Sequence, residues 1–232
     1  MNSSGRVGTL VIGSCVLLSG AAGLVYEVVW MRLLGLLFGH TVLAVSTVLV
    51  AFMAGLAGGA WALGRWADRA RRPLAVYALL ELGIALAAAA VPAVLGGLEI
   101  VYVALTHRVG LSGAPLGLAQ FLLAAAALLP ATALMGGTLP VVARAYGARE
   151  GEPGRTVGYL YALNTLGAVS GAAVAGFALL PWLGVRASVT VAVAANAMAG
   201  IAALLTERCF GTDALSIRPQ RLTRIESAVP VA

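Results

Sequence analysis

Charged side chains are scarce in this sequence. They make up 10% of its 232 residues, whereas 61% are hydrophobic and the mean hydropathy is +0.97. A chain with so little charge falls outside the range of ordinary soluble domains. Lysine is absent, and the 15 basic residues are all arginines that lie mainly between apolar runs. The net charge of +6 is therefore explained by membrane topology, and nucleic-acid binding is not expected.

Cysteine is also rare, which excludes a disulfide framework and a cysteine-based metal site. Cys15 and Cys209 are far apart and show no metal-ligand spacing. The sequence has no recognisable pairing of a nucleophile with a base and no cofactor-binding loop. We therefore expect no catalytic residue, no metal and no cofactor, and we do not expect this chain to be an enzyme by itself.

Long apolar runs dominate what remains, and they predict an all-α, polytopic membrane bundle. A membrane-spanning helix needs about 20 apolar residues. The first run, from Val7 to Trp30, is too long for a signal-peptide core and is expected to be retained as a helix. We predict a transmembrane bundle over residues 1–206 and a basic cytoplasmic tail over 207–232, with six transmembrane helices at about 7–30, 41–63, 74–95, 118–143, 157–180 and 187–205.

The arginines predict how these helices are oriented. Cytoplasmic loops of membrane proteins carry an excess of basic residues. With both termini inside, twelve arginines fall on the cytoplasmic side, including those of 65–72 and 144–155. Only Arg32, Arg108 and Arg186 fall outside. We expect a multi-pass protein of the cytoplasmic membrane, a bacterial inner membrane by type, with the lipid bilayer as its first partner.

Glycine and proline predict where the helices pack or depart from regular geometry. Gly55 and Gly59 have the four-residue spacing that lets two helix backbones approach closely. Three departures are expected: a longer outward loop with a short interfacial helix at 99–117, a kink or partly unwound turn around Pro130 and 135–140, and a tight outward turn at 181–186.

Three charged residues lie within or beside the apolar runs. Glu27 and Arg32 flank the outer end of the first run. In one interpretation Glu27 is a cation or proton site and Arg32 is its counter-ion. In the other, both side chains lie at the membrane interface and extend to the lipid headgroups. Glu81 lies deeper, about 12 Å along the helix from Pro73. An acidic residue at that depth costs about 3 kcal/mol unless it is protonated, paired or facing water, so Glu81 is a functional candidate.

Four amide and hydroxyl side chains in the apolar runs have two possible roles. Polar side chains in membrane helices hydrogen-bond between helices more often than they bind ligands. Hydrogen bonding between helices is therefore the first interpretation for these residues, and ligand binding the second: Gln120, Asn164, Thr165 and Asn196.

Two groups of motifs resemble known membrane proteins. The segment Gly64–Arg72 (GRWADRARR) resembles the loop signature G-x-L-A-D-R-x-G-R-R of the major facilitator superfamily, although Trp66 and Arg71 depart from it. The segments SGAAGLVYEVVWMR (19–32), GGTLPVVAR (136–144) and YALNTLGAVSG (161–171) resemble the membrane portion of the spermidine-synthase-like transmembrane proteins.

This resemblance implies a facilitator-like bundle that is often fused to an aminopropyltransferase-like domain. The glycine-rich cofactor turn of such a domain does not occur in this sequence. Six helices would be half of a facilitator-type transporter, so the resemblance implies a homodimer, a second transporter half, or an aminopropyltransferase-like partner. The family-typical polar positions are Glu27, Arg32, Asp68, Arg69 and Asn164.

Two functions of different classes follow from these features. The first is transport of a small organic cation such as a polyamine, with Glu27, Arg32, Glu81 and Asn164 at the substrate site. In that case Asp68 and Arg69 would form a conformational loop rather than bind substrate. The second is a membrane anchor or scaffold, without transport activity, for an aminopropyltransferase-like enzyme.

Overall fold

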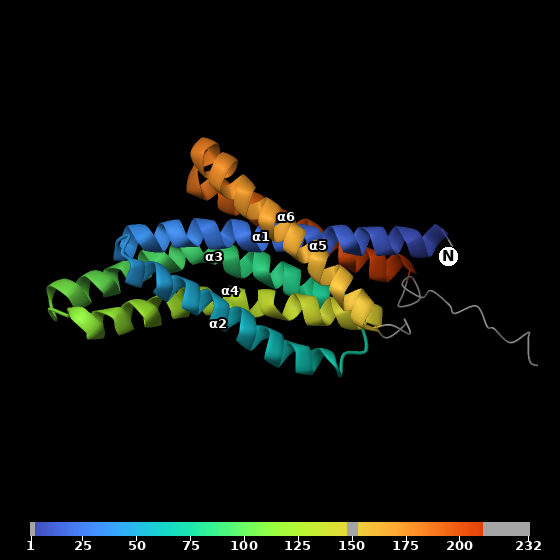
Figure 1. The fold of residues 1–232 in the computed structure, drawn as a ribbon, viewed down its shortest axis with the longest axis horizontal. Helices are drawn as coiled ribbons and strands as arrows, with labels where there is room; N and C mark the ends of the chain where they lie inside the picture. Colours follow the sequence, from blue (N-terminus) through green and yellow to red (C-terminus); the bar gives the residue numbers. More distant parts are fainter. Residues whose placement is uncertain (1–2, 148–152, 211–232) are drawn as a thin grey trace, which may run out of the picture.

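The computed structural model describes residues 3–147 and 153–210, and these residues fold entirely into helices and short connections. Figure 1 shows an elongated bundle in which most helices run along the long axis. The elements in chain order are α1 (Ser3–Phe38), α2 (Val42–Ala67), α3 (Pro73–His107), α4 (Gly113–Gly147), α5 (Pro153–Val174), the π-helix η1 (Ala175–Leu183) and α6 (Gly184–Phe210).

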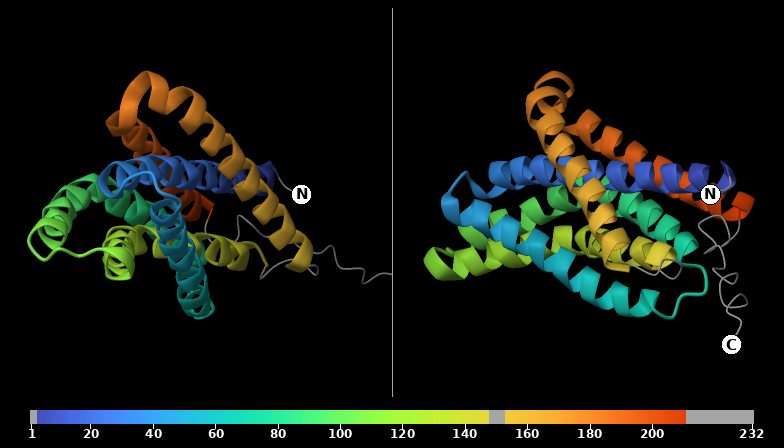
Figure 2. Two further views of the ribbon diagram at one scale, coloured as in Figure 1. Left: turned by 60° about the vertical axis from the view of Figure 1, so that its left-hand side comes forward. Right: turned by 45° about the vertical axis from the view of Figure 1, so that its right-hand side comes forward.

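Five helical segments of the described chain are long and apolar enough to cross a membrane. The expectation of six membrane-spanning segments is corrected to five, because α5, η1 and α6, although separate elements, follow one another without a break and count as one segment. The expected turn at 181–186 is confirmed as a change of direction, and it lies where the π-helix ends and α6 begins. The chain changes direction at Gly184, whose φ of 75° and ψ of −180° are accessible essentially only to glycine. Figures 1 and 2 show α5 and α6 as the two arms that diverge from this bend.

The expected loop at 99–117 is wrong, and so is an unwound turn in α4, whereas a kink at Pro130 stays a prediction. Helix α3 continues through Glu99 to His107, so most of the expected loop at 99–117 is helical. Helix α4 contains Pro130 and Pro140 and remains helical across 135–140. Proline is tolerated in membrane helices because neighbouring groups can satisfy the backbone that it leaves unpaired. Residues 148–152, with Arg149, and 211–232, most of the expected tail, lie outside the described residues.

Glycine sets the closest helix contacts, as the spacing of Gly55 and Gly59 predicted. A Cβ atom added to Gly59 would lie 2.6 Å from the carbonyl carbon of Ala133 on α4. Added to Gly55, it would overlap the side chain of Thr132. From the other side, Gly136 of α4 faces the backbone of α2. The glycines that we expected to unwind α4 therefore serve to bring α2 against it.

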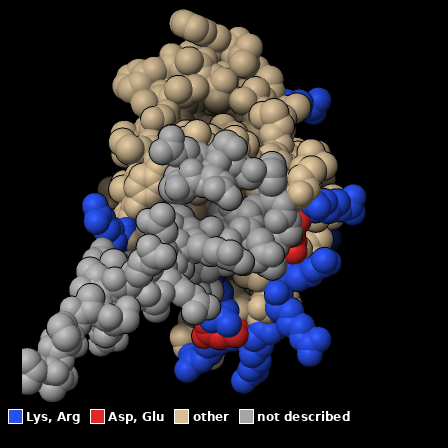
Figure 3. All heavy atoms as spheres, turned by 90° about the vertical axis from the view of Figure 1, so that its right-hand side faces the viewer, with Lys and Arg blue, Asp and Glu red and all other residues tan. Residues whose placement is uncertain are grey.

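One end of the bundle collects arginine side chains, as Figure 3 shows. The turn between α2 and α3 lies at this end and forms two ion pairs with other helices. Asp68 lies 3.7 Å from Arg144 of α4, and Arg72 lies 3.5 Å from Glu207 of α6. The first pair is largely exposed, whereas the Glu207 side chain is buried. Through these two ion pairs, the C-terminal ends of α4 and α6 both contact the turn between α2 and α3.

Candidate functional site

Polar side chains form a layer between two apolar clusters of the core. One cluster contains Trp30, Phe52 and Leu128, and the other contains Val16, Val142 and Leu160. Along the helices, the polar residues lie between the stretches that supply these clusters. The layer comprises Ser19 of α1, Glu81 of α3, Thr132 and Thr138 of α4, Asn164 of α5 and Asn196 of α6. The layer therefore lies near the middle of the bundle, where transporters typically bind their substrates.

Glu81 is the charged residue of this layer, and its side chain is completely buried. The side-chain amide nitrogen of Asn196 donates a hydrogen bond to Glu81 Oε2 at 2.5 Å, which joins α3 to α6. The hydroxyl groups of Ser19 and Tyr77 also face this carboxyl group. The Tyr77 hydroxyl does not reach hydrogen-bonding geometry, and Glu81 Oε1 and Asn196 Oδ1 have no partner among the described residues. The carboxyl group thus has spare hydrogen-bonding capacity in a place that water does not reach freely.

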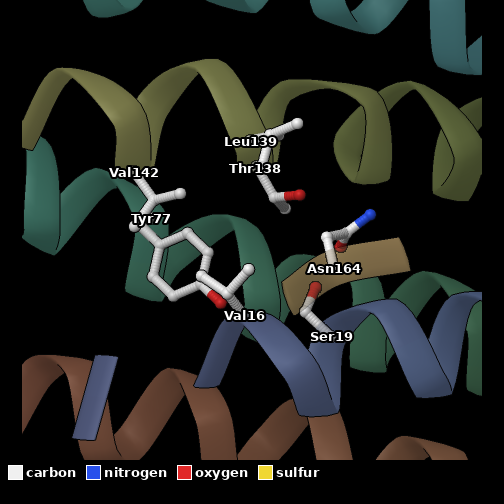
Figure 4. A pocket seen from close by; sticks show the side chains of 7 residues that line it. All are labelled: Val16, Ser19, Tyr77, Thr138, Leu139, Val142 and Asn164. Atoms are coloured by element: carbon white, nitrogen blue, oxygen red, sulfur yellow. The ribbon is translucent and has the colours of Figure 1, made fainter. Parts of the chain in front are cut away.

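A narrow crevice lies beside Glu81 where α1, α3, α4 and α5 meet. It is too narrow to admit a water molecule. Figure 4 shows the hydroxyl groups of Ser19 and Thr138 and the amide of Asn164 near one another, with the Tyr77 ring beside Val16. Ser19 and Tyr77 face both this crevice and Glu81, so the two polar regions are continuous.

Glycines place these side chains by letting the helices approach. A Cβ atom on Gly20 would overlap the backbone carbonyl group of Asn164, so glycine at this position brings α5 against α1. A Cβ atom on Gly200 would lie 3.2 Å from Glu81 Cβ and 3.0 Å from the Ala78 carbonyl oxygen. Asn196 lies one helical turn before Gly200, on the same face of α6. The close contact at Gly200 therefore brings Asn196 to Glu81.

The other predicted site residues lie away from this crevice. Glu27 is half-buried on α1 and has no ion-pair or hydrogen-bond partner within 3–147 and 153–210. Arg32 is exposed on the same helix, and the two do not pair. Asp68 and Arg69 are exposed at the arginine-rich end, where Asp68 faces Arg144. Of the four predicted substrate residues, Glu81 and Asn164 belong to the polar layer, and their roles remain predictions.

The structure adds residues that the sequence did not single out. Ser19, Tyr77 and Thr138 line the crevice, and Tyr77 precedes Glu81 by four residues, a spacing that places both on one helix face. This four-residue spacing from Glu81 is the sequence signal that could have identified Tyr77 as a site residue. Asn196 and Gln120 are confirmed as hydrogen-bonding residues between helices: the Gln120 amide donates to the Tyr102 hydroxyl oxygen at 3.3 Å.

A buried carboxyl group with amide and hydroxyl neighbours can hold an ammonium group or a proton. It offers one negative charge and several hydrogen-bond acceptors. The part of the chain that the structure describes contains no cluster of three or more His, Cys, Asp or Glu residues that could hold a metal ion.

Comparison with known proteins gives a partial match. The chain is 30% identical over 209 residues to proteins named polyamine aminopropyltransferase from two strains of Mycobacterium tuberculosis and one of Mycobacterium bovis. The match covers 85% of this chain but 36% of each relative, so the chain spans about a third of their length. No family model and no solved structure matches the chain. The similarity indicates a spermidine-synthase-like relation.

Proposed function

We propose that this chain is half of a facilitator-like membrane transporter and binds a small organic cation of the polyamine type, with Glu81 as the anionic ligand. The observation that carries the proposal is a fully buried carboxyl group in the mid-bundle polar layer. Buried acidic residues in membrane helices are rare, and they typically lie on ion or substrate pathways. The name of the mycobacterial relatives, polyamine aminopropyltransferase, favours a polyamine as the cation.

The side chains that line the crevice beside Glu81 suit an aliphatic amine, but the crevice is too narrow to hold one. Val16, Leu139 and Val142 supply apolar contacts, and Ser19, Thr138 and Asn164 supply hydrogen-bonding groups. Because the crevice does not admit water, an amine can enter only after the helices separate. We propose that the described arrangement is a closed state, and that a second copy or a second half completes the pathway.

Flux measurement tests this function. The purified chain is reconstituted into liposomes, and uptake of labelled spermidine is compared for wild type, Glu81→Gln and Glu99→Gln. Glu99 lies on the same helix but is exposed, so its variant is the matched control. We expect uptake by wild type and Glu99→Gln and little uptake by Glu81→Gln. Equal uptake by all three proteins, or no uptake above empty liposomes, would contradict the proposal.

We also propose that the chain lies in the cytoplasmic membrane and that its arginine-rich end faces the cytoplasm. The arginine asymmetry of the sequence supports this orientation. With Cys209 replaced by serine, a cysteine at Ala70 should resist an impermeant thiol reagent in intact cells. A cysteine at Ser112, in the turn between α3 and α4, should react. The opposite labelling pattern would reverse the orientation.

The second candidate function is a membrane anchor for an aminopropyltransferase-like enzyme. The observation that favours it is that the relatives bear an enzyme name and extend well beyond the matched region. An anchor predicts that such an enzyme, expressed separately, floats with liposomes only when they contain this chain. It also predicts that no amine binds at Glu81. Amine uptake without recruitment of the enzyme would exclude the anchor.

A further inference from the structure

The Glu81 carboxyl group has no positively charged neighbour in the described residues. The side chains that interact with it from α1 are Ser19, Cys15 and Tyr26, and the nearest on α3 is Tyr77. Helix α6 contributes Asn196. The titratable groups of α4, which also packs against α3, are Arg144 and Tyr146 near its far end.

An isolated carboxylate would therefore be a lone charge in a buried site. Transfer of an unpaired ion from water into an apolar interior costs so much that the group usually becomes neutral instead. Two ligands can neutralise Glu81: a cation, which the proposed function supplies, or a proton. Because the crevice does not admit water and the closest groups are uncharged, the closed state described here favours the proton.

The neighbours of Glu81 can satisfy either form of the carboxyl group. The Asn196 amide nitrogen donates to Oε2, and the hydroxyl groups of Ser19 and Tyr77, which face the carboxyl group, are further donors for an ionised carboxylate once a small movement of the helices brings them into reach. When the carboxyl group is protonated, it becomes a donor. The hydroxyl oxygens of Ser19 and Tyr77, which face the carboxyl group, are then its acceptors.

From this arrangement we infer that Glu81 binds a proton in the closed state and releases it when an amine binds, so that the bundle exchanges one proton for one ammonium group. The O–H bond of the carboxyl group breaks and its proton passes to water through the opened crevice. The carboxylate then pairs with the ammonium group. At Glu81 one ammonium group takes the place of one proton, so the carboxyl group together with its ligand carries no net charge in either state. The inference rests on the proposed function for the amine, but proton binding by Glu81 can be tested separately.

Infrared spectroscopy tests proton binding without any amine. The purified chain, labelled with carbon-13 glutamate, should show at neutral pH the carbonyl-stretch band of a protonated carboxyl group, shifted relative to unlabelled protein. Glu99→Gln should keep this band and Glu81→Gln should lose it. The isotope shift assigns the band to a glutamate, and its loss in Glu81→Gln but not in Glu99→Gln assigns it to Glu81. Absence of the band from wild type at neutral pH would overturn the inference.

Proton release tests the exchange. Spermidine is added to the purified chain in weakly buffered detergent solution, and the released protons are counted with a pH dye against an identical titration of buffer. Wild type and Glu99→Gln should release about one proton per bound amine, and their amine affinity should rise with pH by up to about tenfold per unit. Glu81→Gln should release none. Amine binding without proton release would overturn the exchange and leave the proposed function standing. A protonated Glu81 with no amine binding would instead count against the proposed function and remove the exchange with it.

Discussion

The contact between Gly59 of α2 and the backbone of α4 gives a sharp test of the packing. A Cβ atom at this position would lie 2.6 Å from the carbonyl carbon and 2.7 Å from the Cα atom of Ala133. Because these are backbone atoms, only a shift of a whole helix relieves the overlap. Overpacking of this kind costs about 1–3 kcal/mol. Gly58 is adjacent on the same helix, is exposed, and has nothing within 4 Å of its Cβ position.

The two alanine variants separate this steric cost from helix propensity. Both Gly59→Ala and Gly58→Ala gain the same preference of alanine for helix, about 1 kcal/mol. The difference between their free energies of unfolding therefore reports the overlap alone. We expect Gly59→Ala to be less stable than Gly58→Ala by about 1–3 kcal/mol when both are unfolded reversibly with SDS in mixed micelles. Equal stability of the two variants would refute the described contact between α2 and α4.

Three further predictions concern single interactions. Gly184→Ala should lower the free energy of unfolding by about 1–3 kcal/mol because alanine is strained at this backbone conformation, whereas Gly176→Ala, in open space, should not. Asp68→Asn should lower the free energy of unfolding by less than about 1 kcal/mol, since its ion pair with Arg144 is largely exposed, and a larger loss would contradict that exposed geometry. Asn196→Leu should lower the free energy of unfolding by about 1–3 kcal/mol in wild type, because the Glu81 carboxyl group loses its hydrogen-bond donor. In a Glu81→Leu background the loss should be smaller, since no carboxyl group is present. Equal losses in this double-mutant cycle would refute the coupling of the two residues.

Hydropathy predicted the apolar segments well and their ends poorly. A bilayer sets the minimum length of a span, but it does not end a helix at the membrane surface. Helix α3 therefore continues past Glu99 to His107, and α6 continues to Phe210. Pro130 and Pro140 looked like helix breakers because the sequence does not reveal that α4 lies between α2 and α3, where it is held by packing.

The site was predicted in part for a similar reason. Glu81 was identifiable because a charge in an apolar run is unusual in any fold. Its partner Asn196 was identifiable only as a polar residue, since the pairing of α3 with α6 depends on how the two helices are aligned. The spacing of Gly55 and Gly59 predicted a close helix contact, but not that α4 supplies the other backbone.

Equilibrium binding of labelled spermidine most directly tests the claim that Glu81 holds an ammonium group. Binding is measured with the purified chain in detergent for wild type, Glu81→Gln and Glu99→Gln, and thermal unfolding confirms that each variant is folded. A hydrogen bond to a charged group contributes about 1.5–3 kcal/mol, or roughly ten- to hundredfold in affinity. We predict that Glu81→Gln alone loses affinity by that factor. Equal affinity of the three proteins, or no binding by wild type, would contradict the account.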